Sequence, residues 1–404
     1  MHVIAPARYQ SQPTRRSKRR LWLIPTALLL AVGAFNYLRP LPAPVATLSI
    51  STPAGTTTPV ISWPGSGQAA VAASGYGLLG TDGNIKPLAT ASIAKVIAAL
   101  CVLQKQPLNL SQSGPTYTVG ASDVDIYQTY AAENGSLIPV TAGEQLTEYQ
   151  ALEAIMIPSA NNIADSLVRW VFGSHQAYAA YASTFLEQHG MHDTHIGSDA
   201  SGFDPSTTST ASDLTNLGLL ALKNPVLMQI AGKSSTTLPV VGAVSNYDTI
   251  LGIHGITGLK TGNNDDDPGA FLFTATTQVG GQDILLTGSV MGAADLNTAL
   301  QNSTQLVASM QQGFEQVSVA QTGKVIGTMH AVWGASTPIT ARQSVGLVRW
   351  KATPLTETHH IDTSIRSGTV GSLKLAAGQA QSQSSLQLSH PLAGPSFWWR
   401  LTRH

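Results

Sequence analysis

The chain has 404 residues, enough for two or three domains with a sizeable core, and its 22 basic and 22 acidic side chains cancel. Charged residues make up only 11% of the chain, which argues against nucleic acid as a partner. Cys101 is the only cysteine, so an intramolecular disulfide and a cysteine-based metal site are both excluded.

The first 38 residues are typical of a membrane anchor. Residues 1–20 are polar and basic, whereas residues 21–38 carry no charge and are just long enough to span a bilayer. Because basic flanks stay in the cytoplasm, we expect a cytoplasmic tail at 1–20, a transmembrane signal-anchor at 21–38, and everything after it outside. A cleaved signal peptide is the alternative, although the alanines of the Ala-Pro-Val-Ala stretch at residues 43–46 are one residue too far apart for a good cleavage site.

Two further regions flank the largest part of the chain. Residues 39–60 are rich in proline, threonine, serine and alanine, which predicts an extended linker. Residues 316–404 contain short β-branched runs separated by glycine, threonine and proline, which predicts a small all-β domain. Its aromatic and basic end, residues 397–404, either packs on this domain as a strand or tail, or touches a membrane interface.

Residues 61–315 show the mixed pattern of an α+β domain. Short apolar runs between Ser62 and Leu79 predict strands, with a hairpin turn at Thr81-Asp82-Gly83. Residues 112–145 are polar, and we expect them to be irregular. Apolar periodicity predicts helices at 90–105, 146–157, 162–172, 176–188, 211–222 (with Ser212 as N-cap) and 296–314, and paired strands at 270–275 and 283–290.

The helix at 90–105 is apolar on every side, which predicts that it is buried. Ser92 and Lys95 interrupt it, and their spacing places both side chains on one helical face about one turn apart. Burial lowers the pKa of a lysine and favours the neutral amine, which can take a proton from serine. The alternative is a serine N-cap followed by a lysine whose amine reaches solvent.

Two more motifs follow Ser92-Ile93-Ala94-Lys95 in order: Ser159-Ala160-Asn161 in a turn between helices, and Lys260-Thr261-Gly262 on a strand. This trio occurs in serine β-lactamases and penicillin-binding proteins. Over residues 62–315 the chain resembles the low-molecular-mass penicillin-binding proteins, the serine-type D-alanyl-D-alanine carboxypeptidases. The resemblance implies a β-lactamase/transpeptidase-like domain, an antiparallel sheet with helices on both faces plus a helical lobe, followed by a small all-β domain. Gly202-Phe203-Asp204 and Pro268-Gly269-Ala270 also match the family.

The resemblance implies that Ser92 is the nucleophile and forms an acyl-ester with the penultimate D-alanine. Lys95 is then the general base that accepts the serine proton, Ser159 extends the proton relay, and Asn161 holds the substrate amide.

The remaining implied residues bind the substrate. Lys260 and Thr261 meet the terminal carboxylate, and Gly262 lets the substrate backbone come close. The backbone N–H groups of Ser92 and Asn263 hold the oxyanion.

These residues predict a membrane-anchored serine D,D-carboxypeptidase that removes the terminal D-alanine from peptidoglycan stem pentapeptides and is acylated by β-lactams. We expect no cofactor and no metal. A D,D-endopeptidase that cuts peptidoglycan crosslinks, or a non-catalytic β-lactam-binding sensor or scaffold, remains possible on the sequence. A β-lactamase is less expected because no Glu-x-x-Leu-Asn stretch is present. Three positions depart from the family's usual residues without removing a reacting group: Asn162, Thr257 and Asn263.

Overall fold

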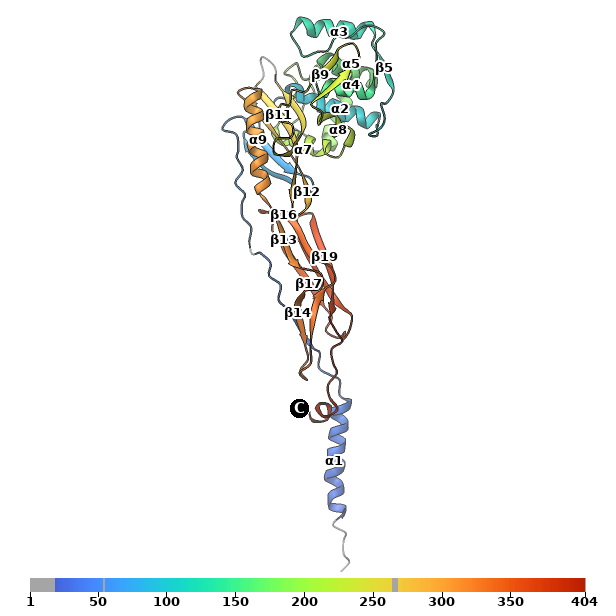
Figure 1. The fold of residues 1–404 in the computed structure, drawn as a ribbon, viewed down its shortest axis with the longest axis vertical. Coiled ribbons are helices and arrows are strands. Elements are labelled where there is room, and N and C mark those ends of the chain that lie inside the picture. Colours follow the sequence, from blue (N-terminus) through green and yellow to red (C-terminus); the bar gives the residue numbers. More distant parts are fainter. Residues whose placement is uncertain (1–18, 54, 264–267, 404) are drawn as a thin grey trace, which may run out of the picture.

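The computed structural model describes residues 19–53, 55–263 and 268–403, and their side chains from residue 23 onwards. The molecule is elongated, with three parts along its long axis (Figure 1). A mixed α/β domain lies at one end, a β domain in the middle, and helix α1 (Arg19–Leu38) at the other end. The predicted basic tail at 1–20 lies almost wholly outside the described residues.

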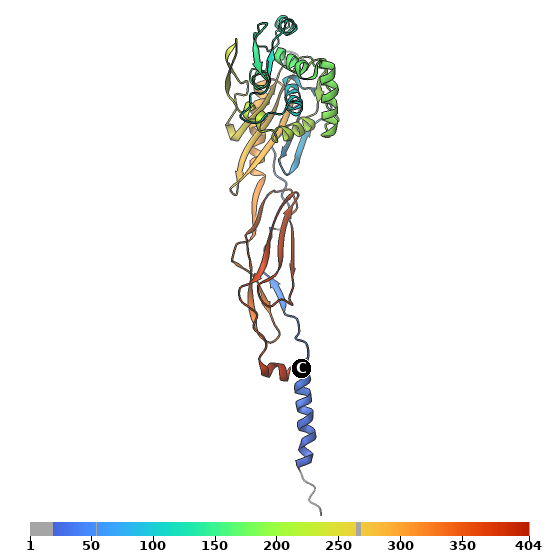
Figure 2. The ribbon, with the colours of Figure 1, turned by 90° about the vertical axis from the view of Figure 1, so that its right-hand side faces the viewer.

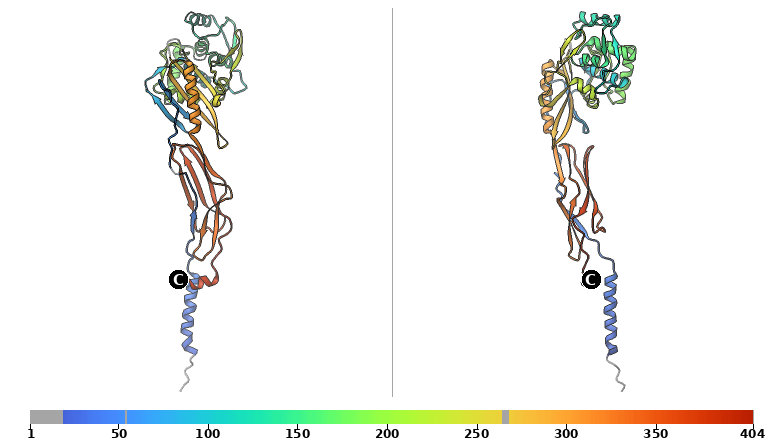
Figure 3. Two further views of the ribbon diagram at one scale, coloured as in Figure 1. Left: turned by 60° about the vertical axis from the view of Figure 1, so that its left-hand side comes forward. Right: turned by 45° about the vertical axis from the view of Figure 1, so that its right-hand side comes forward.

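A five-stranded antiparallel sheet forms the centre of the α/β domain, in the order β10-β11-β12-β2-β3. Helix α9 (Leu296–Gln312) covers one face, and α7 (Ala211–Ala221) packs on the other (Figure 3). Alternation along β11 fits this arrangement, because Phe271 and Phe273 share a core with α9 whereas Leu272 joins the core on the α7 side. The strands are β2 (Gln68–Ala73), β3 (Gly77–Gly83), β10 (Ile256–Gly262), β11 (Gly269–Val279) and β12 (Gln282–Ala293).

A helical lobe packs on the α7 side of the sheet around α2 (Ala94–Lys105). Every residue of α2 from Ala94 to Leu103 is buried, which explains why this helix is apolar all round. The lobe also contains the helices α3 (Ala121–Ala132), α4 (Glu148–Met156), α5 (Asn161–Phe172), α6 (His175–Gln188) and α8 (Pro225–Ala231), the short turns η1 (Ala91–Ile93) and η2 (Ile253–Gly255), and the strand pairs β4 (Leu88–Ala89) with β7 (Thr208–Ser209), β5 (Thr116–Thr118) with β6 (Gln145–Thr147), and β8 (Ser235–Leu238) with β9 (Gly242–Ser245).

The β domain combines a six-stranded sheet, β1-β14-β15-β19-β18-β17, with the pair β13-β16. Its own core includes Ile339, Leu373 and Leu386, all fully buried. The α+β class with a trailing β domain is therefore confirmed. The strands are β13 (Phe314–Ala320), β14 (Val325–His330), β15 (Ser336–Ala341), β16 (Val345–Trp350), β17 (Thr356–Ile361), β18 (Thr369–Ala377) and β19 (Ala380–Leu388).

The predicted linker at 39–60 runs along the β domain (Figure 2). Within it, β1 (Val45–Leu48) pairs antiparallel with β14 and becomes an edge strand of the six-stranded sheet. Arg349 Nη2 donates to the Gly55 carbonyl at 3.3 Å, and the Thr57 N–H donates to the Lys351 carbonyl at 3.2 Å. The segment is thus docked by backbone hydrogen bonds and by one bond from the Arg349 side chain, which its proline-rich composition did not predict.

The C-terminal segment lies beside the end of α1 that is nearer the β domain (Figure 2). The C-terminal segment forms helix α10 (Phe397–Thr402), not a strand, and packs against α1. Asn36 Nδ2 donates to the Leu401 carbonyl at 3.1 Å, and Arg403 Nε donates to the Asn36 carbonyl at 2.9 Å. In the described part of the chain, no helix is both long enough and apolar enough to cross a membrane. The first two side chains of the expected span at 21–38 lie outside that part, so the anchor stays a prediction.

Three local predictions in the α/β domain were wrong. The hairpin between β2 and β3 turns at residues 74–76, while Thr81-Asp82-Gly83 lies within β3. Residues 112–145, expected to be irregular, contain α3. The N-cap of α7 is Thr210, whose hydroxyl accepts from the Asp213 N–H, and Ser212 lies inside the helix.

Candidate active site

Ser92 lies in the single turn η1 that leads into α2, and Lys95 lies in the first turn of α2. Lys95 Nζ is 2.8 Å from Ser92 Oγ, as the three-residue spacing predicts. Ala91, directly before the serine, has a positive φ of 45°, an unfavourable conformation for a residue with a side chain. The strained turn and the buried helix together fix the serine hydroxyl beside the amine.

The lysine amine has three neighbours in hydrogen-bond range. Asn161 Oδ1 at 2.7 Å and the Ser201 carbonyl at 3.0 Å are oxygens that only accept, and Ser92 Oγ is the third neighbour. A neutral amine has two N–H groups and one lone pair. If Asn161 and Ser201 take the two N–H groups, the lone pair faces the Ser92 hydroxyl, which is the arrangement a general base needs.

Electrostatics favour the neutral amine. Lys95 is fully buried, and burial lowers its pKa well below the ordinary lysine value. The nearby charge of Lys260 lowers the pKa further, whereas Asp199 and Asp165 raise it. Because burial is the largest of these effects, the site keeps the amine ready to accept a proton.

The second motif occupies the turn between α4 and α5. Asn161 begins α5, and its N–H donates to the Ser136 carbonyl at 2.8 Å, which orients the side chain toward Lys95. Ser159 has a positive φ of 59°, and its side chain is buried. Its hydroxyl makes no hydrogen bond within the described residues. The role of Ser159 in a proton relay therefore stays a prediction.

The third motif lies on β10, at the edge of the central sheet, where an extended peptide can add to unpaired backbone groups. A side chain at Gly262 would place its Cβ 2.9 Å from the Thr90 carbonyl and 3.3 Å from Ala91 Cβ. In this structure the missing side chain therefore lets β10 approach the turn that carries Ser92. This packing reason differs from the expectation that Gly262 makes room for substrate.

Lys260 and Thr261 are buried beside this edge. Lys260 Nζ contacts the Thr261 carbonyl at 3.2 Å and the Thr261 hydroxyl at 3.4 Å. Burial lowers the pKa of Lys260 to about 7, an effect that Asp248 partly opposes. Near neutral pH this amine therefore gains or loses its charge easily.

A cleft of about 680 Å³ is lined by Ser92 and Asn161 of the first two motifs together with Asn263. Asn263 is exposed, directly after β10. The predicted oxyanion donors, the backbone N–H groups of Ser92 and Asn263, thus belong to residues on one cleft, and their role stays a prediction. Across the described residues, no three histidine, cysteine, aspartate or glutamate side chains gather as a metal site would require.

The loop at residues 199–204 supplies a part of the site that the motifs did not predict. Asp199 Oδ1 accepts hydrogen bonds of 2.6 Å from the N–H groups of Ser201 and Gly202, and Asp199 Oδ2 accepts one of 2.7 Å from the Asp204 N–H. These bonds fix the loop so that the Ser201 carbonyl reaches Lys95. Asp199 therefore positions an acceptor for the Lys95 amine.

Helix α3 forms the opposite wall of the cleft through Tyr130. The tyrosine hydroxyl donates to Asp165 Oδ2 at 2.7 Å and lies 3.3 Å from Ser201 Oγ. Asp165 Oδ1 accepts from the Ala200 N–H at 2.8 Å. Burial raises the pKa of Asp165, and the Ala200 N–H and Tyr130 oppose that shift. This network ties α3, α5 and the 199–204 loop together at the cleft that Ser92 lines.

Comparison with known proteins agrees with this geometry. The model of the S11 peptidase family, described as D-alanyl-D-alanine carboxypeptidase, matches residues 73–295, which contain all three motifs. The chain belongs to this family. The serine peptidase activity predicted from the motifs is therefore confirmed at the level of the family.

Individual relatives of this S11 peptidase are distant. The D-alanyl-D-alanine carboxypeptidase of Streptomyces sp. is 25% identical over 56% of this chain and 78% of the relative. The D-alanyl-D-alanine carboxypeptidase DacB2 of Mycobacterium tuberculosis is 32% identical over 47% of this chain and 62% of its own length. The structure of penicillin binding protein 5 from Haemophilus influenzae covers 84% of this chain and all of its own, with a TM-score of 0.58 and 16% identity, and shows likeness of fold.

The residues of this S11 peptidase that sequence reasoning missed are Tyr130, Asp165, Asp199 and Ser201. One signal was present, because Gly202-Phe203-Asp204 matched the family pattern directly after two of them. Gly202 has a positive φ of 72°, and a Cβ there would lie 2.1 Å from the Ala91 carbonyl. Only glycine fits at position 202, because the loop approaches the turn that carries Ser92 so closely. This glycine was the sequence signal for the loop. No comparable signal marked Tyr130.

Proposed function

We propose that this S11 peptidase removes the terminal D-alanine from peptidoglycan stem pentapeptides through an acyl-enzyme on Ser92. The observation that carries the proposal is the position of Lys95 Nζ, 2.8 Å from Ser92 Oγ, with its other two neighbours being acceptors. A proton acceptor beside the attacking hydroxyl gives a chemical reason for a lysine buried in an apolar helix at this point.

In the first step Ser92 Oγ attacks the carbonyl carbon of the penultimate D-alanine, and its proton passes to Lys95 Nζ. The C–N bond then breaks, the leaving D-alanine nitrogen takes that proton, and the substrate remains as an ester on Ser92. Water attacks this ester in the second step, with its proton passing to the regenerated amine, and the serine hydroxyl is restored. Asn161 and the Ser201 carbonyl hold the amine in one orientation through both steps.

Substrate selection rests on the free carboxylate. The peptide lies along the edge of β10, and its terminal carboxylate meets the Lys260 ammonium and the Thr261 hydroxyl, a charge-assisted pairing. Ser159, in the turn of the second motif, completes the proton path during substrate binding. The S11 family acts on D-Ala-D-Ala ends, and a β-lactam, which imitates this end, acylates Ser92 in the same way.

The test is release of free D-alanine from a stem pentapeptide by the full chain in detergent. We expect release that is blocked by benzylpenicillin and absent in Ser92→Ala, with Ser111→Ala, an exposed serine in the same lobe, as the matched control. A crosslinked muropeptide dimer is run in parallel. Cleavage of the dimer without release from the pentapeptide would replace the carboxypeptidase by an endopeptidase. Acylation by penicillin without turnover of either substrate would indicate a sensor.

We also propose that residues 21–38 anchor the chain in the cell membrane, with residues 1–20 in the cytoplasm and the α/β domain outside. The support is the exposure of large apolar side chains on α1, including Ile24, Leu29 and Leu38, each more than 70% exposed. Such exposure in water is unfavourable over a continuous helix. Fractionation of cells expressing the full chain tests the proposal. Recovery of the full chain in the aqueous fraction would contradict it.

A further inference from the structure

Helix α3 turns one face to the cleft rather than to the core. Ile126, Thr129, Tyr130 and Glu133 all line the cleft, and their spacing of three and four residues places them on one side of the helix. Only Tyr130 among them is buried. The missing apolar stripe of α3 therefore has a reason, because this face is open to whatever occupies the cleft.

The cleft has room for more than the end of the substrate. Its volume of about 680 Å³ lies in the range of roughly 300–1,000 Å³ that holds a drug-sized ligand, which is larger than two alanines. Ser92 lines the cleft, whereas Lys260 and Thr261, which we propose to meet the terminal carboxylate, do not. The leaving D-alanine thus lies towards β10. The acyl part of the substrate, which begins with the residue before D-Ala-D-Ala, extends into the cleft.

The charged side chains that line the cleft are all acids: Glu133, Asp165, Asp199 and Asp204. No lysine or arginine joins them among the lining residues that the structure describes. Asp165 and Asp199 use their oxygens in hydrogen bonds within the protein. Hydrogen bonds from Ser206 lower the pKa of Asp204, so this half-buried acid is ionised near neutral pH. The carboxylates that remain for a ligand are those of Asp204 and exposed Glu133, on opposite walls.

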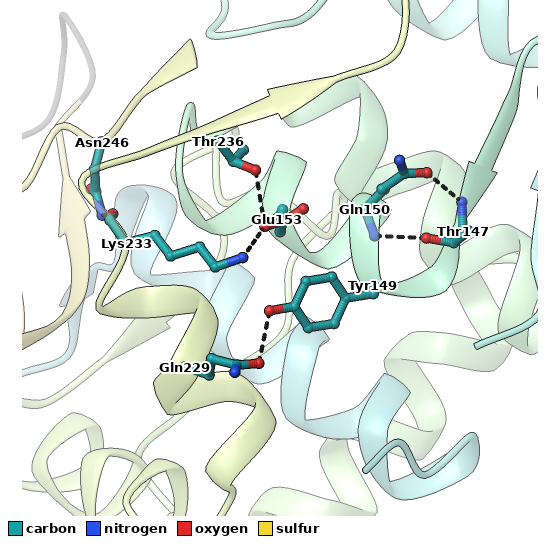
Figure 4. A network of polar contacts seen from close by, with 8 residues as sticks. All are labelled: Thr147, Tyr149, Gln150, Glu153, Gln229, Lys233, Thr236 and Asn246. Carbon is teal, nitrogen blue, oxygen red and sulfur yellow. Dashed lines mark hydrogen bonds and ion pairs between the residues drawn. The ribbon is translucent and has the colours of Figure 1, made fainter. Parts of the chain in front are cut away.

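Glu133 makes no ion pair with any described residue, in contrast to another glutamate of the same lobe. Buried Glu153 on α4 pairs with Lys233 Nζ at 2.6 Å and accepts a hydrogen bond of 3.0 Å from the Thr236 hydroxyl (Figure 4). The lobe thus neutralises the acid that it buries and leaves the acid of the cleft to a cation from outside the chain.

Apolar side chains share the cleft with these acids. Ile126 on α3 and Phe203 on the opposite wall both line it, and the Phe203 ring packs edge to face on Tyr130 with centroids 5.5 Å apart. A substrate side chain with an aliphatic stem and a cationic tip suits both kinds of surface, because the stem packs on the apolar groups while the tip meets a carboxylate.

We propose that Glu133 is a specificity-determining residue, which selects stem peptides whose residue before D-Ala-D-Ala carries a side-chain ammonium. Asp204 adds to the same attraction from the other wall. The inference rests on the proposed function and deepens it by naming the chemistry of the acyl part. A diamino acid with a free terminal amine is the chemical class that meets this description.

The test compares release of D-alanine by the full chain in detergent from two peptides. One is Nα-acetyl-L-lysyl-D-alanyl-D-alanine, and the other is the same peptide with its ε-amine acetylated, which removes the charge. We expect a higher kcat/KM for the free amine. Glu133→Gln should lower the ratio of the two kcat/KM values by about two- to fivefold, which is the effect of one exposed charge pair. Raising the ionic strength from about 0.01 M to about 1 M should lower the wild-type ratio as well, because the Debye length falls from about 30 Å to about 3 Å.

Asp125→Asn is the matched control, because Asp125 is an exposed acid on the same helix that does not line the cleft. Its ratio should equal that of the wild type. Glu133→Lys should lower the ratio below that of Glu133→Gln, because it repels the ammonium. Labelling of Ser92 by a fluorescent penicillin shows that each variant is folded, and if Glu133→Gln does not fold, Glu133→Ser is judged by the same ratio.

A third peptide separates the two kinds of diamino acid that supply such an ammonium. Its side chain ends in an ammonium and a carboxylate together. Because the extra carboxylate lies beside the same acids, we expect slower release than from the lysine peptide. Equal or faster release would assign the selected ammonium to this second kind.

An unchanged ratio in folded Glu133→Gln overturns the proposal. Equal loss on both peptides does so too, because it assigns Glu133 to the structure of the cleft instead of to the substrate. If the wild type releases D-alanine from both peptides equally well, the proposed function stands and this inference fails. If the wild type releases D-alanine from neither peptide, the proposed function itself fails, and the role of Glu133 fails with it.

Discussion

Gly202 lies where the 199–204 loop contacts the turn that carries Ser92, and its replacement by alanine tests how tightly the loop and the turn are coupled. The new Cβ would lie 2.1 Å from the Ala91 carbonyl and 2.8 Å from Ala94 Cβ, in a backbone with φ of 72°. Both neighbours belong to the segment that holds Ser92, so relief of the clash must move that segment away from the Ser201 carbonyl.

Two effects add in Gly202→Ala. A left-handed conformation costs a residue with a side chain roughly 1–2 kcal/mol, and overpacking against backbone costs about 1–3 kcal/mol more. The sum, about 2–5 kcal/mol, corresponds to a loss of roughly 4–20 °C in Tm for a domain of this size. A shift of the reacting atoms by as much as 1 Å lowers the acylation rate by about 100-fold.

The assay combines thermal unfolding with the rate of labelling by a fluorescent penicillin. Gly190→Ala is the matched control, because Gly190 has nearly the same φ of 73° but no atom within 4 Å of the added Cβ. Gly190→Ala should lose only the stability that the left-handed conformation costs, about 1–2 kcal/mol. Its rate of labelling by the fluorescent penicillin should equal that of the wild type. If the two variants lose equal Tm and label at equal rates, the contact between loop and nucleophile turn does not position the site.

Three other predictions concern single groups in the site. Because burial lowers the pKa of Lys260 to about 7, its charged fraction falls by about 90-fold between pH 6 and pH 9. We expect kcat/KM for a carboxylate-ended peptide to fall with this charged fraction. The ratio of that kcat/KM to the kcat/KM for an uncharged ester should follow the same curve, and a ratio that does not change with pH would exclude Lys260 as the carboxylate partner. Lys95→Met keeps the side-chain volume but loses the base, so penicillin labelling should slow by about 10²–10⁴-fold, whereas Lys105→Met, at the exposed end of the same helix, should label normally. Tyr130→Phe removes the 2.7 Å bond to Asp165 and should cost about 1–3 kcal/mol in urea unfolding, with Tyr127→Phe on the same helix as control; equal stability of the two variants would show that this bond does not hold the cleft wall.

Apolar periodicity predicted the bounds of the lobe helices accurately where the helix buries apolar side chains. Helix α5 and helix α6 begin and end within one residue of the predicted bounds, and α2 ends at the predicted Lys105. Helix α3 was missed because only Tyr130 among its residues is buried, so its sequence carries no apolar stripe. The hairpin turn was misplaced because the Asp-Gly signal occurs inside a strand, where Gly83 approaches the Gly67 carbonyl.

The contact between Ser92 and Lys95 was predictable because they are three residues apart at the start of one helix, where local geometry decides the contact. Their partners were not, because they come from distant parts of the chain. The Ser201 carbonyl is a backbone atom that no motif marks, and it is placed by the hydrogen bonds of Asp199.

The central claim, that Ser92 is the nucleophile and Lys95 its base, is tested most directly by mapping the covalent adduct. The full chain is incubated with benzylpenicillin, digested and analysed by mass spectrometry, alongside Lys95→Met. We expect one adduct, with the mass of the intact antibiotic, on the peptide that contains Ser92, formed much more slowly in the variant. An adduct on another residue, or equal rates with and without the Lys95 amine, would contradict this assignment.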